Sequence, residues 1–508
     1  TVSHETDLLA QLTAGSFFYY VVGVVGAVAV GSCVLSAVCC AALWKGWCDD
    51  FWLPIAYLPL AHVLLQRSYG ALLALIEVVL VVSAVLAVDR NLHRKLMETA
   101  ARWWPRLANE ATIILTIYVV AFLFRFTAAQ RLSGMGIHVV MTNTDDPDQY
   151  HNAALRILRG EWIPRYTSVG YDVFLAGLYR LTNVRIGAVL VLQAAFASTV
   201  PVAVYLLGRR LFDRAAGITA GVLAALSQVL IFNSVNLTRE VAGSLFAPWG
   251  ALLLVLALPR GRQKKGPWMT LTAGAVFGFL IAYDPAFLIV SLCLVAGFMV
   301  CTRFTLLQRV TQIAVFLIVA GVCSYGTIRF ATGDKTILAR TDNNLAQSVS
   351  TDFNPYASLL YHRRINVFAY PAETVSNILA NPLSNAGLIA RKLWLDSRRF
   401  LFESNAGRFD PVILIMGSFL AANVDFYGYF FGFLGAAVGV GAVFRRPARL
   451  DRAVLYLVIL SYAAVYVVLF FGMTRFRVPI QPLLLVLVGV GIVTTFRFAL
   501  RGSFSGLR

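Results

Sequence analysis

The feature that most constrains this sequence is a series of long apolar runs that recur from residue 17 to residue 497. Each run is roughly 17–25 residues long, which is the length that an α-helix needs to cross the hydrocarbon core of a bilayer. The runs are continuous and do not alternate with polar residues, so they favour helices over the strands of a transmembrane barrel. The sequence therefore predicts an all-α polytopic membrane protein.

We predict about thirteen membrane-spanning helices from these runs. They are expected at residues 17–43, 51–66, 70–89, 111–129, 187–207, 216–232, 241–258, 268–284, 286–302, 313–331, 421–443, 453–472 and 479–497. The stretch TVSHETDLLAQ before the first run is polar and acidic, unlike the basic start of a signal peptide, so we expect that run to be retained as a span.

The distribution of Lys and Arg predicts the orientation of the chain. Basic loops such as 89–106, 208–214, 259–266 and 444–452 alternate with short loops that carry few basic residues. Because basic loops stay on the cytoplasmic side, the N-terminus is expected outside and the C-terminus inside, in the plasma (inner) membrane. The long segments 130–186 and 332–420 then lie outside.

This topology divides the chain into four parts. They are three extra N-terminal helices with a cytoplasmic linker (1–109), a core with the first exterior loop 130–186 (110–331), a large exterior region (332–420) and C-terminal spans (421–508). Both exterior segments contain amphipathic patterns, in YHNAALRILRGEW and over residues 376–402. Such patterns predict helices that lie along the membrane surface.

The distribution of charge and of cysteines argues against a nucleic-acid-binding protein and against a disulfide-stabilised one. The net charge is +18, but the basic residues are spread over many loops where topology requires them, so we expect no nucleic-acid partner. Six of the seven cysteines fall in apolar runs, where they are expected as small apolar side chains and not as disulfides.

The stretch NTDDPDQY at residues 143–150 places Asp145, Asp146 and Asp148 within four positions at the start of an exterior loop. Pro147 is expected to end any helix before itself, which makes Asp148 an N-cap or first-turn residue of the helix that follows. Capping explains one aspartate. Adjacent carboxylates repel each other, so the pair Asp145–Asp146 is expected to hold a cation or to act as a base toward an acceptor hydroxyl or amine.

These residues resemble those of the GT-C glycosyltransferases, polytopic enzymes that take a sugar from a polyprenyl-phosphate carrier. The resemblance rests on the order and exterior placement of DDPDQYHNAALRILRGEW, TSVGYDVFLAGLY, NSVNLTREVAGSLF and GMTRFRVPIQPLL, and it covers residues 110–497. The protein O-mannosyltransferase-like and aminoarabinose-transferase-like branches are the most similar by pattern. The resemblance implies a GT-C fold and sugar transfer with inversion at the exterior face.

The resemblance also implies residue roles. Asp146 is expected as the catalytic base, with Asp145 as its first substitute, because Asp146 has the acid-x-x-x-Tyr spacing to Tyr150. Arg475 and Arg477 are expected to bind the donor phosphate, since guanidinium groups bind phosphate bidentately. The remaining substrate-binding candidates are Asp148, Tyr150, Tyr171, Glu240, Arg391 and Lys392.

Several of these residues have alternative interpretations. Glu240 at the start of a span is also suited to stabilising the helix dipole, paired with Arg239. Arg475 and Arg477 are also suited to snorkelling at the interface, and Arg391 and Lys392 to a solvated basic face. The sequence departs from the family where the acidic pair is Asp-Asp-Pro in place of Asp-Glu, and where Asp172 stands at a position that is commonly proline.

The cofactor and the acceptor stay open at this point. The acidic pair Asp145–Asp146 is suited to Mg²⁺ or Mn²⁺, and no other cofactor is expected. The expected partners are a polyprenyl-phosphate sugar, membrane lipids, and a glycan, lipid or protein acceptor. The alternative function is a transporter or flippase of lipid-linked sugars, but such proteins usually carry mid-span charges and broken helices. Here the charges gather in the outer loops.

Overall fold

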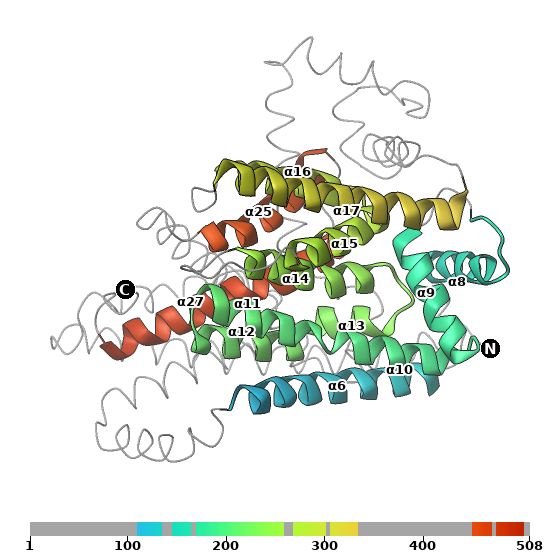
Figure 1. The fold of residues 1–508 in the computed structure, drawn as a ribbon. Helices are drawn as coiled ribbons and strands as arrows, with labels where there is room; N and C mark the ends of the chain where they lie inside the picture. The colour runs from blue at the N-terminus through green and yellow to red at the C-terminus, as the bar shows by residue number, and fades with distance from the viewer. Residues whose placement is uncertain are drawn as a thin grey trace, which may run out of the picture. The chain divides into compact units, whose positions relative to one another are not determined.

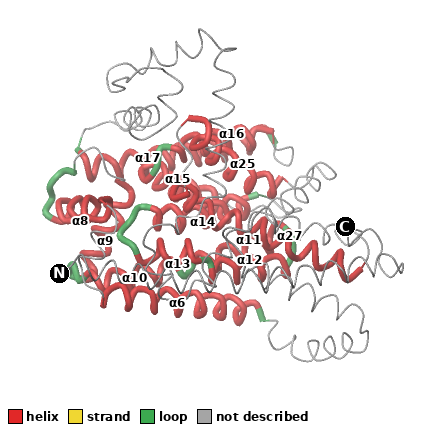
Figure 2. Tube along the Cα trace, turned by 180° about the vertical axis from the view of Figure 1, so that it is seen from behind, coloured by secondary structure: helices red, strands yellow, loops and turns green. Residues whose placement is uncertain are grey.

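The computed structural model describes residues 109–134, 145–163, 169–258, 268–300, 305–333, 450–469 and 474–501. Every regular element in these ranges is a helix (Figures 1 and 2). The chain divides into two compact units. The larger comprises Ile113–Ile415 and Tyr427–Ile492, and it contains almost all of the described residues. Of the smaller unit, the structure describes only the first residues of α6 and the last residues of α27.

Four helical segments within the described ranges are long and apolar enough to cross a membrane. They are α6 (Glu110–Gly134), α10 (Ile186–Ala197) continued by α11 (Val200–Leu211), α14 (Glu240–Ala257) and α17 (Leu306–Thr332). Shorter apolar helices are α15 (Trp268–Tyr283), α16 (Ala286–Val300), α25 (Leu450–Ala464) with the π-helical η2 (Val465–Leu469), and α27 (Gln481–Arg501). These helices confirm the prediction of a multi-pass, all-α membrane protein. The expected spans 17–43, 51–66, 70–89 and 421–443 lie outside the described residues, as does the region 332–420 apart from its first two residues.

The expected span 216–232 is not one continuous helix but a pair of helices that together are long and apolar enough for one broken span. α12 (Arg214–Leu226) and α13 (Gln228–Val235) are separated at Ser227 and bent by 50°. The fully buried guanidinium of Arg125 on α6 donates to the carbonyl oxygens of Ala224 (3.3 Å) and Ala225 (3.2 Å), in the last turn of α12. A helix end leaves carbonyls without intrahelical partners, and hydrocarbon offers no replacement. Arg125 supplies the missing donors.

Glycines allow the helices to approach one another closely. α15 packs against α14 and α17, and α11 packs against α12 (Figure 1). A Cβ atom added at Gly278 would lie 2.5 Å from the carbonyl oxygen of Ala320, and one at Gly208 would lie 2.8 Å from the Cα of Gly217. Membrane helices commonly use small residues where backbones come into contact.

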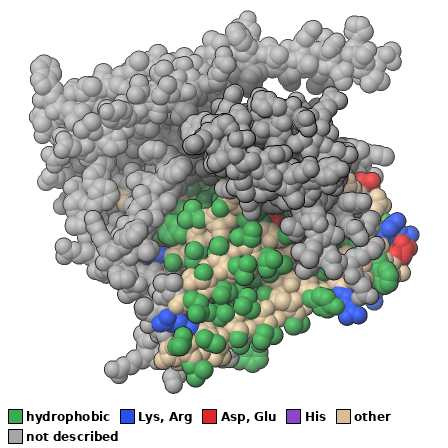
Figure 3. Space-filling model, turned by 90° about the horizontal axis from the view of Figure 1, so that it is seen from above, with side chains coloured by type: hydrophobic (Ala, Val, Ile, Leu, Met, Phe, Trp, Pro, Cys, Tyr) green, Lys and Arg blue, Asp and Glu red, His purple; other side chains and the backbone are tan. Residues whose placement is uncertain are grey.

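Large apolar side chains are exposed on the outer helices of the larger unit. The space-filling view shows a face of the described part on which hydrophobic side chains predominate (Figure 3). The exposed residues include Leu115, Val119 and Leu123 on α6, and Leu307, Ile318, Val322 and Phe330 on α17. Exposure of this kind suits a surface that faces lipid and not water.

The loop 130–186, which is expected on the exterior side, contains α8 (Asp145–Leu158), which packs against α9 (Val169–Thr182). An amphipathic helix is confirmed in this loop, but it begins earlier than expected. α8 starts at Asp145, two residues before Pro147, so Pro147 does not end a helix there. Proline is tolerated in a first turn because the N–H groups of that turn have no intrahelical partner. All three aspartates therefore lie at the N-terminal end of α8, where the helix dipole favours negative charge.

Candidate functional site

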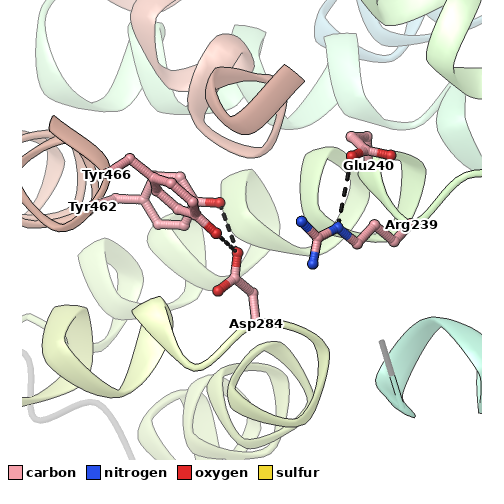
Figure 4. A network of polar contacts seen from close by, with 5 residues as sticks. All are labelled: Arg239, Glu240, Asp284, Tyr462 and Tyr466. Carbon is pink, nitrogen blue, oxygen red and sulfur yellow. Dashed lines mark hydrogen bonds and ion pairs between the residues drawn. The ribbon is translucent and has the colours of Figure 1, made fainter. Parts of the chain in front are cut away.

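Three short segments, each expected on the exterior side, meet at one place in the larger unit. They are the turn before α14, the turn at Asp284-Pro285 between α15 and α16, and the segment formed by α26 (Thr474–Arg477) and η3 (Val478–Ile480). η3 packs against α14, and the π-helical η2 packs against α16. Figure 4 shows the polar side chains that this arrangement brings together.

Asp284 is a buried carboxylate that accepts three hydrogen bonds. One oxygen accepts from the backbone N–H of Ala286 at 3.0 Å, which caps the start of α16. The other accepts from the hydroxyl groups of Tyr462 (3.0 Å) and Tyr466 (2.5 Å), as drawn in Figure 4. Asp284 is only 4% exposed, and a carboxylate at that depth needs such donors to offset its lost hydration. Asp284 therefore joins the α15–α16 turn to α25 and η2.

Tyr466 continues this connection toward α26. It belongs to η2, a π-helical segment, and such segments are frequent at functional sites. Its ring stacks on Phe476, with centroids 4.6 Å apart and planes inclined by 17°. The guanidinium carbon of Arg239 lies over the Phe476 ring, 5.6 Å from its centroid. A cation over an aromatic face is attracted by the ring quadrupole.

Arg239 and Glu240 form an ion pair at the start of α14. The Nε atom of Arg239 lies 3.6 Å from a carboxylate oxygen of Glu240, and the side chains are 13% and 5% exposed. Burial acts to lower the pKa of Arg239, but the neighbouring Tyr150 and Glu240 outweigh it, so that pKa lies well above its usual value. Arg239 is thus a permanent cation. The pairing that the sequence offered as the alternative role of Glu240 is confirmed.

The side of the site toward α9 is formed by Tyr150 and Tyr171, whose rings meet edge to face at 5.1 Å. The Tyr171 hydroxyl donates to the side-chain oxygen of Gln193 at 3.3 Å. The Gln193 amide in turn donates to the carbonyl oxygens of Ser234 and Asn236, in the segment that leads to Arg239. Burial, and then Tyr179, raises the pKa of Tyr171 well above its usual value, so Tyr171 stays a phenol.

A second polar contact joins α8 to α9. The Nδ1 atom of His151 lies 2.6 Å from the hydroxyl oxygen of Tyr179, which is fully buried. Burial lowers the pKa of His151, and the charge of Asp148 opposes that shift. The neutral imidazole is therefore favoured, and its Nδ1 atom shares one hydrogen bond with the Tyr179 hydroxyl. This bond anchors the helix that carries Asp145 and Asp146.

The structure brings together only some of the residues that the sequence singled out. Tyr150 and Glu240 lie next to Arg239, and Tyr171 contacts Tyr150, while Asp148 is exposed on α8. Arg477 is 1% exposed and follows Phe476 in α26. The side chains of Asp145, Asp146 and Arg475, and all of Arg391 and Lys392, lie outside the described part, so their roles remain predictions.

Asp284, Tyr462, Tyr466, Phe476 and Gln193 were missed by the sequence reasoning. One signal was present for Asp284, because the short loop AYDP, which is expected on the exterior side, carries an acid at the boundary of a span, as the loop before α14 does with Glu240. The two tyrosines fall in an apolar run and resemble ordinary span residues. In the described ranges, no three side chains of His, Cys, Asp or Glu gather as metal ligands would.

Part of the chain that contains these residues is similar to a known protein family. Residues 168–325, which include Tyr171, Arg239, Glu240 and Asp284, match the model of the dolichyl-phosphate-mannose-protein mannosyltransferase family. No curated protein sequence matches the chain significantly.

The solved structures similar to this chain include an oligosaccharyltransferase of Archaeoglobus fulgidus. Its apo form has a TM-score of 0.46 at 14% identity, over 75% of this chain and 50% of that one. The complex of AglB with an inhibitory peptide and a dolichol-phosphate gives 0.45 at 14% identity, over 77% and 50%. The form with Zn and sulfate gives 0.46 at 16%, over 76% and 50%. This chain thus spans about half the length of those chains. The match over residues 168–325 shows similarity to a family described as protein mannosyltransferases, which agrees with the resemblance that the sequence motifs indicate.

Proposed function

We propose that this protein transfers a sugar from a polyprenyl-phosphate donor to an acceptor at the exterior face of the membrane. The observation that carries the proposal is the position of Arg239 and Glu240, a cation and an anion side by side where three segments meet that are expected on the exterior side. A phosphate-linked sugar offers the matching chemistry, an anionic phosphate next to hydroxyl groups. The description of the matched family, which names a lipid-phosphate sugar, supports the donor class.

In this proposal Arg239 contacts the donor phosphate. Its ion pair with Glu240 uses Nε, and the two terminal nitrogens point away from Glu240 (Figure 4). A guanidinium presents its N–H donors in a planar fork that fits two phosphate oxygens. Arg475 and Arg477 remain proposed phosphate contacts, as do Arg391 and Lys392. Arg239 is added to this set by the structure.

Glu240 is proposed to accept hydrogen bonds from hydroxyl groups of the donor sugar. A carboxylate is an acceptor only, and it is therefore suited to hydroxyl donors and unsuited to a second anion. Tyr150, which is buried on α8, is proposed to line the same side, and Asp148 is proposed as a substrate contact from the exposed face of that helix. Tyr171 is fully buried, and we propose that it supports Tyr150 through their edge-to-face contact.

The proposed reaction is a single displacement. The acceptor oxygen or nitrogen attacks the anomeric carbon, while the bond from that carbon to the phosphate oxygen breaks. The acceptor proton passes to Asp146, or to Asp145, and the polyprenyl phosphate leaves as an anion beside Arg239. Attack opposite to the leaving phosphate gives inversion. A cation placed where the phosphate charge develops lowers the barrier electrostatically. A divalent cation held by Asp145 and Asp146 is the alternative role for that pair.

A transporter of lipid-linked sugars is the second candidate, and the broken α12–α13 pair with its buried arginine is the observation that favours it. However, Arg125 donates to the backbone carbonyls of Ala121, Ala224 and Ala225, which is a capping role. The broken span therefore has a structural explanation that requires no transported substrate.

A transfer assay with a panel of polyprenyl-phosphate sugars tests the proposal on the full-length protein in nanodiscs. We expect one donor to support transfer, and Asp146→Asn to lower the rate by about 10²–10⁴, the usual contribution of a general base. A larger loss of transfer rate in Asp145→Asn than in Asp146→Asn would identify Asp145 as the base. Full activity of both variants would reject an aspartate base. Movement of lipid-linked sugar across liposomes, without transfer from any donor, would establish the transporter instead.

A further inference from the structure

We propose that Asp284 is a positioning residue for Arg239, acting through the hydroxyl of Tyr466 and the ring of Phe476. The inference rests on the proposed function in one respect, that Arg239 contacts the donor phosphate. It assigns a task to a buried carboxylate that the proposed chemistry does not otherwise use. Asp284, Tyr466, Phe476 and Arg239 come from four separate elements, and each contacts the next.

The side chain of Asp284 is itself fixed in position. Its carboxylate caps the first turn of α16 through the N–H of Ala286, and Pro285 restricts the backbone just after it. Because one carboxylate oxygen accepts the hydrogen bond from Ala286, the orientation of the carboxylate is fixed and the other oxygen points toward η2. Tyr466 donates to that second oxygen at 2.5 Å.

The hydrogen bond from Tyr466 to Asp284 sets the plane of the Tyr466 ring. A phenol whose hydroxyl is held at one end and whose backbone is held at the other has little freedom to rotate. The ring presents one face to Phe476 in a nearly parallel stack. Phe476 in turn carries the guanidinium of Arg239 over its ring. The position of the Phe476 ring therefore influences where the terminal nitrogens of Arg239 lie.

Tyr462 provides a matched control within the same network. Its hydroxyl donates to the same oxygen of Asp284 at 3.0 Å, and both tyrosines are nearly fully buried. The Tyr462 ring contacts Phe287 and Tyr466 instead of extending the stack toward Arg239. Loss of the Tyr462 hydroxyl removes a hydrogen bond of the same kind without removing a member of the chain of contacts that ends at Arg239.

The kinetic test compares Tyr466→Phe with Tyr462→Phe in the full-length protein in nanodiscs. Tyr466→Phe is expected to raise the KM for the polyprenyl-phosphate sugar about tenfold, the effect of one lost hydrogen bond, with a smaller change in kcat. Tyr462→Phe is expected to stay within about twofold of the wild type for donor KM. Asp284→Asn, which keeps an acceptor oxygen, is expected to recover part of the activity that Asp284→Ala loses. Equal effects of the two tyrosine variants on donor KM would overturn the inference.

A double-mutant cycle on thermal unfolding tests the same coupling without any donor. Tyr466→Phe and Arg239→Met are expected to be non-additive in Tm, because both disturb one stack, whereas Tyr462→Phe and Arg239→Met are expected to add. Additive behaviour of the first pair would reject the positioning role. Non-additive unfolding together with no transfer from any donor would instead reject the proposed function and leave the contact chain established. The two failures are therefore distinguishable.

Discussion

The Oε1 atom of Glu240 lies 3.6 Å from the Nε atom of its sequence neighbour Arg239, and both side chains are largely buried. Residues adjacent in a helix point in different directions, but Arg239 precedes the first turn of α14, so its side chain is able to turn back toward Glu240. Removal of one member of such a pair leaves a buried charge without its counter-ion. The pair is therefore sensitive to single substitutions.

Substitution of Arg239 should act on the donor. We expect Arg239→Gln to raise the donor KM by roughly 10- to 100-fold, because a charge-assisted hydrogen bond contributes about 1.5–3 kcal/mol. Arg239→Lys keeps the charge but loses the planar fork, and it should fall between wild type and Arg239→Gln. Steady-state kinetics with varied donor measure both. Arg180→Gln, at an exposed position of α9, is the matched control. An unchanged donor KM in Arg239→Gln would exclude Arg239 from the phosphate site.

Arg125 should matter for folding and not for chemistry. Arg125→Met would leave the last carbonyls of α12 without donors in an apolar interior, at a cost of about 2–5 kcal/mol in the free energy of unfolding. Thermal unfolding in detergent should show a clear fall in Tm, and Arg125→Lys should give a smaller one. The activity of the remaining folded protein should be retained. A Tm equal to that of the wild type would mean that the break at Ser227 needs no arginine cap.

The sequence predicts several spans and part of the candidate site for identifiable physical reasons. Hydrophobic length is a local property, so α6, α14 and α17 could be recognised from apolar runs alone. The pairing of Glu240 with Arg239 was accessible because the two are neighbours. The contact between Asp284 and Tyr466 joins positions 182 residues apart, and no spacing rule predicts it. The partners of Arg125 on α12 are similarly remote.

The start of α8 illustrates a different limit. Pro147 signals a helix boundary because proline disfavours helical geometry in the residue before it. The same proline is compatible with the first turn of a helix, so a helix is able to begin either after Pro147 or just before it. In the structure the helix begins just before the proline, because α8 starts at Asp145. Local rules of this kind locate a boundary only within a few residues.

The contact between His151 and Tyr179 predicts a dependence of stability on pH. Burial holds the pKa of folded His151 below the unfolded value of about 6.5. The unfolded state therefore binds more protons, and stability falls as the pH drops through about 6.5 toward the folded pKa. Tm should decrease over this range in the wild type and decrease less in His151→Asn, which keeps an acceptor but does not titrate. Parallel pH profiles for the two proteins would contradict this assignment.

Gly170 and Gly177 offer the last prediction, because they lie on the same helix in opposite environments. A Cβ atom at Gly170 would lie 2.8 Å from the backbone nitrogen of Tyr283 and 2.9 Å from its Cα, whereas nothing lies within 4 Å of a Cβ atom at Gly177. Backbone atoms cannot rotate aside, so Gly170→Ala should cost about 1–3 kcal/mol in unfolding free energy. Gly177→Ala should instead stabilise the protein by roughly 0.5–1 kcal/mol, because alanine favours helix.

The clash that Gly170→Ala introduces should also disturb the candidate site, since Tyr283 immediately precedes Asp284. A displaced Tyr283 backbone moves the carboxylate that holds Tyr466, so Gly170→Ala should raise donor KM in the same direction as Tyr466→Phe. Thermal unfolding and donor kinetics on the two alanine variants measure both effects. If Gly170→Ala and Gly177→Ala shift Tm alike, α9 does not pack against the end of α15 as closely as the structure shows.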